Sequence, residues 1–149
     1  DGRYLKVLGE KKMPLAITLG FMERYIGLGF ASEKDKNDYD IMQNNIQVML
    51  KAGATPLFTS DVPGIPAKEV IPMVTGVMKG QGIDNKTILL SATREGAKAL
   101  GVTNLGTLEQ GKIADLILVD GDPLKDIKAL ERVQLVVKDG AVVVNHLKK

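Results

Sequence analysis

The strongest constraint on the fold of this chain is a change in its residue pattern near residue 104. Before that point, apolar residues return every three or four positions in segments long enough for helices, such as 39–51 and 84–100. After it, short β-rich runs follow one another, such as 114–119 and 133–138. This change indicates a helix-rich part followed by a strand-rich part, with the best internal boundary near residue 104.

The first part carries several shorter signals. Residues 4–8 alternate between polar and apolar, and residues 13–19 are compatible with either a buried strand or the start of a helix. The charged residues 33–38 are typical of a surface loop, and residues 54–59 indicate a short strand that Pro56 interrupts. A further helix is expected over about 67–79.

Capping and turn signals are clear in both parts. Asp84 or Asn85 is suited to capping a helix that runs to about Leu100, where Gly101 provides a stop. The pair Asp139-Gly140 lies between two β-rich runs and predicts a type I′ hairpin, because both turn positions tolerate a positive φ.

Composition excludes several classes of protein. The 149 residues are 44% apolar and 26% charged, which is typical of a globular chain, and no uncharged apolar run is long enough to span a membrane. Twenty basic and 18 acidic residues are too balanced for a dedicated nucleic-acid-binding protein. The absence of cysteine excludes disulfides and thiol catalysis, and the single His146 excludes a multi-histidine metal site within this chain. We expect a cytoplasmic protein without a membrane partner.

The beginning of the chain is unusual. Asp1-Gly2-Arg3 shows neither an initiator methionine nor a signal-peptide pattern. We therefore expect the start of the natural polypeptide to be missing.

Asp61 is the strongest candidate for a functional residue. It follows an apolar strand signal, and a carboxylate in that position is suited both to binding a divalent metal and to accepting a proton from water. Barrel enzymes place their chemistry at the carboxyl ends of their strands. The alternative is a structural role, in which Asp61 forms a turn or a cap before Val62-Pro63.

Three motifs, in order, resemble the C-terminal part of metal-dependent amidohydrolases, in the branch that contains imidazolonepropionase-like and prolidase-like hydrolases. Residues 52–61 (AGATPLFTSD) are similar to the last barrel strand with its aspartate. Residues 91–101 (SATREGAKALG) are similar to the A-T-x-x-x-A-x-x-L-G helix of that family, and residues 106–116 (GTLEQGKIADL) to its G-x-x-x-x-G-K-x-A-D motif. The likeness extends over roughly residues 40–145.

The resemblance implies a fold and a function. The fold is α/β: residues 1–104 would form the last strands and helices of a (β/α)₈ barrel, and residues 105–149 the C-terminal strands of a small β-sandwich. The complete enzyme, called the parent below, would hydrolyse C–N bonds in amides, cyclic amides or dipeptides with a divalent metal, of which zinc is favoured. The resemblance assigns Asp61 as metal ligand and catalytic residue.

The same resemblance limits what this chain can do alone. It lacks the family's early His-x-His pair, the bridging lysine or glutamate and the later histidines, so we expect the chain to be inactive and to hold no metal tightly. The alternative function is a non-catalytic folding or assembly module that pairs with the missing N-terminal part of the barrel or with another copy. A self-contained ligand-binding module is a third class, disfavoured because Asp61 alone suggests a polar site.

Overall fold

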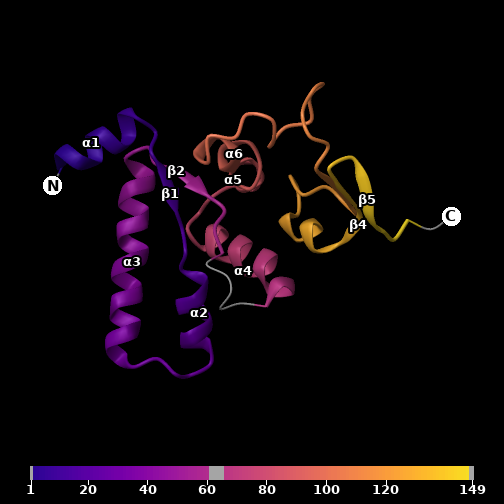
Figure 1. Ribbon diagram of the computed structural model, residues 1–149. Helices are drawn as coiled ribbons and strands as arrows, with labels where there is room; N and C mark the ends of the chain where they lie inside the picture. The colour runs from indigo at the N-terminus through magenta and orange to yellow at the C-terminus, as the bar shows by residue number, and fades with distance from the viewer. Residues whose placement is uncertain (1, 61–65, 148–149) are drawn as a thin grey trace. The chain divides into compact units, whose positions relative to one another are not determined.

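The computed structural model describes residues 2–60 and 66–147. These residues divide into two compact units, Asp1–Ile83 (unit 1) and Asp84–Lys149 (unit 2), and each is considered by itself (Figure 1). Unit 1 contains α1 (Gly2–Glu10), β1 (Pro14–Ala16), α2 (Gly20–Gly27), α3 (Glu33–Lys51), β2 (Thr55–Leu57) and α4 (Ala67–Gly80).

Unit 1 is built around a short parallel strand pair. β1 and β2 pair in register, with Pro14 opposite Thr55 and Ala16 opposite Leu57. A parallel pair needs a long crossover connection, and here α2 and α3 provide it. The core of the unit gathers around the pair and α4, and it contains Ile17, Leu19, Ile46, Ala54, Val74, Val77, Met78 and Ile83.

The crossover is a helical hairpin. α2 and α3 run side by side and are joined at one end by a short loop (Figure 1). The loop interpretation of residues 33–38 is wrong, because α3 already begins at Glu33. Ser32 caps this helix: its hydroxyl accepts from the Asp35 amide, and the Asp35 carboxylate accepts from the Ser32 amide at 2.8 Å. This reciprocal capping favours a helix start in an otherwise solvated, charged segment.

The alternation in residues 4–8 does not produce a strand, since these residues lie within α1. Leu5 and Leu8 are half-buried while Tyr4, Lys6 and Val7 are exposed, so the apolar face follows helical spacing. α1 lies against the end of α3, where a Cβ built on Gly9 would come within 1.9 Å of the Ala52 carbonyl oxygen. A stretch of five residues is too short to distinguish the strand period of about 2 from the helix period of about 3.6. Here the contact between α1 and α3 favours the helix.

Unit 2 begins with two short helices, where the sequence predicts a single one. Asp84 caps α5 (Asn85–Ser91) as predicted, with its carboxylate accepting from the Thr87 amide at 3.0 Å. α6 (Arg94–Ala99) follows after a break at Thr93, which leaves the helical region (φ −127°, ψ −100°). The Thr93 hydroxyl donates to the Leu89 carbonyl at 2.7 Å, and such local bonds compete with helix continuation.

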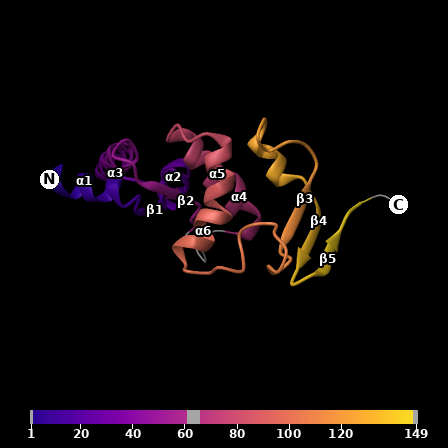
Figure 2. The same cartoon turned by 90° about the horizontal axis from the view of Figure 1, so that it is seen from above.

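The rest of unit 2 is a three-stranded antiparallel sheet in the order β3–β4–β5, visible side by side in Figure 2. Its strands are β3 (Leu116–Val119), β4 (Val133–Lys138) and β5 (Ala141–Asn145), and a 3₁₀ turn, η1 (Ile127–Glu131), lies between the first two. The predicted hairpin turn is confirmed, since Asp139 (φ 50°) and Gly140 (φ 77°) both have positive φ.

Asp115 fastens this hairpin to the residues before β3. Its carboxylate accepts from the Asp139 amide at 2.8 Å and from Lys138 Nζ at 2.6 Å. The Gly140 amide donates to the Ala114 carbonyl at 3.0 Å. The Asp139 amide, and then the Lys138 ammonium, hold the pKa of the Asp115 carboxyl below its usual value.

Along the chain, unit 1 ends at Ile83 and unit 2 begins at Asp84. The expected division near residue 104, between a partial barrel and a partial β-sandwich, stays a prediction. Among the described residues, no helix combines the length and the apolarity that a bilayer crossing requires.

Candidate functional site

The carboxyl ends of β1 and β2 lie at the same edge of the strand pair, because the strands are parallel and in register. Beyond the ladder, the Thr59 hydroxyl donates to the Ile17 carbonyl at 3.1 Å and ties the two chain segments together. Ile17 is almost fully buried, so this bond is anchored in the core. The segments that follow β1 and β2 are therefore joined by a hydrogen bond at this edge.

Asp61, the predicted catalytic residue and metal ligand, lies outside the described residues. The described chain reaches Ser60, three residues after the end of β2. In parallel α/β proteins, residues that follow the carboxyl end of a strand are placed where ligands bind. The assignment of Asp61 to metal binding and catalysis stays a prediction.

An open hollow of about 410 Å³ lies between α2 and α4. α2 contributes Glu23 and Arg24, and α4 contributes Glu69 in its first turn and Met73 one turn later. Arg24 and Glu69 form an ion pair across the hollow. The pair links α2, which follows β1 in the chain, to α4, which follows β2. It therefore stabilises the packing of these two helices.

The other acidic residue of this hollow is held by a tyrosine. Tyr39 Oη, on α3, donates to Glu23 Oε1 at 2.5 Å. Partial burial, and then the hydrogen bond to the Glu23 carboxylate, raise the pKa of Tyr39, so the phenol stays protonated at neutral pH. Tyr39 therefore serves as a donor that orients Glu23.

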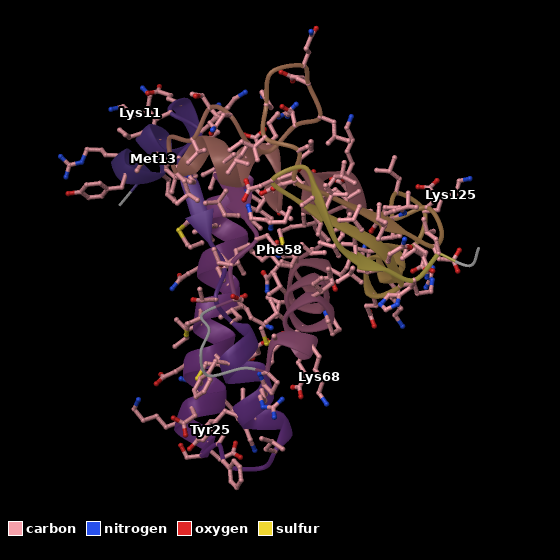
Figure 3. The ribbon with its side chains drawn as sticks, turned by 45° about the vertical axis from the view of Figure 1, so that its right-hand side comes forward. Lys11, Met13, Tyr25, Phe58, Lys68 and Lys125 are labelled. Carbon is pink, nitrogen blue, oxygen red and sulfur yellow. The ribbon has the colours of Figure 1, made fainter. Side chains whose placement is uncertain are left out.

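Three aromatic residues of unit 1 form a cluster around Tyr25, which Figure 3 labels in the α2–α3 hairpin. The Tyr25 ring stacks on Phe21 with a centroid separation of 6.4 Å and lies 6.1 Å from Phe30. Phe58, also labelled in Figure 3, follows β2 instead. The stacked rings stabilise the hairpin end and contribute no chemical group to the strand edge.

A metal centre requires several ligand side chains close together. Within residues 2–60 and 66–147, there is no cluster of three or more histidine, cysteine or acidic side chains able to hold a metal ion. His146 follows β5 and is exposed, with its backbone amide bonded to the Gln134 carbonyl at 2.7 Å. The described residues by themselves do not fit a catalytic metal, which needs about three protein ligands.

Sequence reasoning did not find the ion pair that lines the hollow or the bond of Tyr39 to Glu23. Arg24 and Glu69 are 45 residues apart, and Glu23 and Tyr39 are 16 residues apart. Neither separation follows a helical or hairpin rule, so only the packing of three helices brings them together.

Comparison with solved structures places the fold among amidohydrolases. A Xaa-Pro dipeptidase with methionine bound in its active site matches with a TM-score of 0.77 and 26% identity over 97% of this chain. A putative prolidase from Bifidobacterium longum matches with a TM-score of 0.77 and 26% identity over 91%. A mutant atrazine chlorohydrolase from Arthrobacter aurescens, complexed with zinc and atraton, matches in fold with a TM-score of 0.57 and 20% identity over 98%.

These likenesses cover only part of the solved proteins. The chain spans 38%, 36% and 34% of the dipeptidase, the putative prolidase and the chlorohydrolase, respectively. No curated protein sequence matches the chain. The mixed α/β class is confirmed at the level of the fold.

Family membership rests on a sequence comparison that is independent of the fold. The model of the amidohydrolase family matches residues 40–143, which include all three motifs recognised in the sequence. Because this match covers more than half of the chain, the protein belongs to the amidohydrolase family.

Proposed function

We propose that this chain is the C-terminal part of a metal-dependent hydrolase that acts on C–N bonds in amides, cyclic amides or dipeptides. The observation that carries the proposal is the family match over residues 40–143, in which the parallel strand β2 leads toward Asp61. The fold likeness to a Xaa-Pro dipeptidase and a prolidase supports a small-molecule substrate with such a bond.

In this proposal β1 and β2 are the last two strands of a (β/α)₈ barrel. Their parallel register, the helices that follow each of them and the position of Thr59 support that assignment. β3, β4 and β5 are the C-terminal strands of the small β-sandwich, and the boundary between the two parts lies near residue 104.

We assign Asp61 two roles in the parent, as a metal ligand and as the carboxylate that accepts the proton of the attacking water. Amidohydrolases are generally metal-dependent, and the zinc in the chlorohydrolase supports zinc as the metal of the parent. The remaining ligands would come from the part of the barrel that this chain does not contain. The described residues do not form a metal site, so we expect the isolated chain to be inactive.

The test is the substitution Asp61→Asn in the longer protein that contains this chain, assayed with Xaa-Pro dipeptides and cyclic amides. We expect turnover to fall by at least about a hundredfold, because an amide neither accepts the proton nor binds a metal as well as a carboxylate. Asp40→Asn, the same change on the exposed face of α3, is the control and should leave turnover unchanged. Near-normal turnover in Asp61→Asn would remove Asp61 from its proposed role.

Metal retention by the isolated chain provides a second test. Purified residues 1–149, exposed to zinc and then dialysed, should contain much less than one zinc per chain by elemental analysis. Stoichiometric zinc that survives dialysis would contradict the proposal that the ligand set is incomplete.

A second candidate function is an assembly module, and the exposed apolar surface of the small sheet favours it. Val142 and Val143 are each 59% exposed on the edge strand β5, and Ile117 and Leu118 on the other edge strand are about half exposed. Ile117 and Leu118 are consecutive residues in the regularly paired part of β3 and point to opposite faces, so both faces of the sheet present apolar side chains. Unpaired edges with such side chains favour pairing with another segment.

We therefore propose that residues 1–149 associate with the missing N-terminal part of the barrel or with a second copy. Size-exclusion chromatography with light scattering should give a mass above the 16.1 kDa of one chain. A stable monomer of that mass would overturn the assembly function and leave the hydrolase proposal intact, since the latter concerns the parent. A cytoplasmic location remains part of the same proposal.

A further inference from the structure

A basic hollow of about 300 Å³ lies in unit 2 between α6 and the chain segment 101–112, and we call it the α6 hollow. Three cationic side chains line it: Arg94 and Lys98, one turn apart on α6, and Lys112 from the far end of the segment. No acidic residue is among the described residues that line it. Arg94 and Lys112 are each paired with a neighbouring carboxylate, so the excess positive charge of the hollow is that of Lys98. A concave surface with an excess of one charge attracts ligands of the opposite charge.

The three cationic side chains differ in whether they are already bound to other side chains. Lys98 is exposed and carries no ion pair with any described residue. Arg94 is bound to the neighbouring Glu95 at 2.8 Å, and Lys112 to Glu109 at 3.2 Å and to the Thr107 hydroxyl. An arginine has five N–H donors and a lysine has three, so each of these side chains keeps a donor beyond its present partners. Arg94 and Lys112 can therefore donate to a second acceptor.

The α6 hollow also has apolar lining residues. They are Ala97 on α6 and Val102 and Leu105 on the segment that follows. All three are half-buried, so they present carbon surface to the hollow beside the charged side chains. A ligand that fits both features has a negatively charged group and a short apolar body.

The backbone fixes the shape of the hollow. Gly106 has a φ of 87°, and a Cβ built on it would come within 2.8 Å of Ala97 Cβ and 3.0 Å of the Thr93 carbonyl oxygen. The Val102 amide donates to the Ala97 carbonyl at 2.9 Å, and the Ile113 amide to the Asn104 carbonyl at 3.0 Å. The segment is thus packed closely on α6, and the hollow is largely formed before a ligand arrives.

We propose that the α6 hollow binds a small organic carboxylate with a short apolar body. The carboxylate lies among Lys98, Arg94 and Lys112, and the apolar body lies on Ala97, Val102 and Leu105. This site does not depend on the proposed hydrolysis, because every residue that lines it belongs to unit 2.

The probe is phenylacetate, titrated into ¹⁵N-labelled residues 1–149 and followed by amide chemical shifts. We expect saturable shifts confined to about residues 94–112 and a dissociation constant on the order of 1 mM, typical of so small a ligand. Phenylacetamide keeps the ring and removes the charge, and acetate keeps the charge and removes the ring. Each should bind at least about fivefold more weakly than phenylacetate.

Variants separate this site from general charge attraction. Lys98→Gln should weaken phenylacetate binding about fivefold, whereas Lys98→Arg should retain it. Lys86→Gln removes the same charge from an exposed position on α5, outside the hollow, and should leave binding unchanged. Unchanged melting curves for the three variants show that the fold is retained.

Four results would overturn the proposal: shifts that do not saturate, equal binding of phenylacetamide, equal binding of acetate, or equal losses in Lys98→Gln and Lys86→Gln. If Lys98→Gln lowers the melting temperature, the Lys98→Arg variant and the two ligand controls decide the outcome. Loss of binding in Lys98→Arg as well would then count against the site.

Discussion

The two units of this chain achieve their folds by different means. In unit 1, the central strand pair joins Pro14 to Thr55 and depends on a crossover of two helices. In unit 2, β4 and β5 are joined by a two-residue turn, and Asp115 is bonded to the turn itself. Unit 1 therefore depends on contacts between residues distant in sequence, while the sheet of unit 2 is specified largely by local turn chemistry.

The two units should therefore differ in how much stability they lose when one side chain is removed. Long-range contacts must overcome the entropy of closing a long loop, and buried side chains supply most of that free energy in unit 1. The three-stranded sheet of unit 2 exposes much of its apolar surface, so single side chains there contribute less.

The largest effect is expected at the end of β1. Ile17 is 1% exposed, and Ile17→Ala should lower the free energy of unfolding by about 2–5 kcal/mol through lost burial and a cavity. Ile117→Ala, the same change on β3 where the side chain is 47% exposed, should cost less than about 1.5 kcal/mol. Urea unfolding followed by far-UV circular dichroism measures both. Equal losses of unfolding free energy in the two variants would contradict the proposed difference between the units.

The second effect concerns the contact of α1 with α3. Gly9→Ala places a Cβ 1.9 Å from the Ala52 carbonyl oxygen, so α1 must shift, and we expect a loss of about 1–3 kcal/mol. Gly27→Ala is the control, since no atom lies within 4 Å of the added Cβ. If Gly9→Ala were as stable as Gly27→Ala in thermal melts, the packing of α1 on α3 would not contribute to unit 1.

The third effect tests a feature that both units share. Ser32 caps α3 in unit 1 and Asp84 caps α5 in unit 2. Ser32→Ala and Asp84→Ala should each cost about 1 kcal/mol, because each leaves a helix amide without its acceptor. Ser32→Thr and Asp84→Asn retain an acceptor and should recover most of the loss in urea unfolding. A loss of stability in only one of the two alanine variants would show that helix capping does not stabilise both units.

The smallest effect is a pH dependence in unit 2. The pKa of Asp115 is lowered in the folded state by the Asp139 amide and the Lys138 ammonium. Its contribution to stability is therefore fully present above the unfolded pKa of about 3.9 and is lost as the pH falls through the lower, folded value. Asp115→Asn should reduce the acid sensitivity of the β4–β5 turn, measured by hydrogen exchange at Gly140. An unchanged acid profile would show that this carboxylate does not fasten the hairpin.

Those parts of the protein that depend on neighbours in the chain follow from the amino-acid sequence. The positive φ values of Asp139 and Gly140, the cap at Asp84 and the stop at Gly101 reflect the conformational preferences of single residues. The motifs around residues 52–61, 91–101 and 106–116 also sufficed to identify the family, since the match over residues 40–143 covers them.

The features that join distant segments depend on tertiary packing. Residues 4–8 are helical where α1 packs on α3, although their alternation alone leaves the period open. The Arg24–Glu69 pair and the basic rim of the α6 hollow arise when helices and loops pack together. Local preferences carry no information about which distant side chains will meet, because that choice is made by burial of the whole apolar surface.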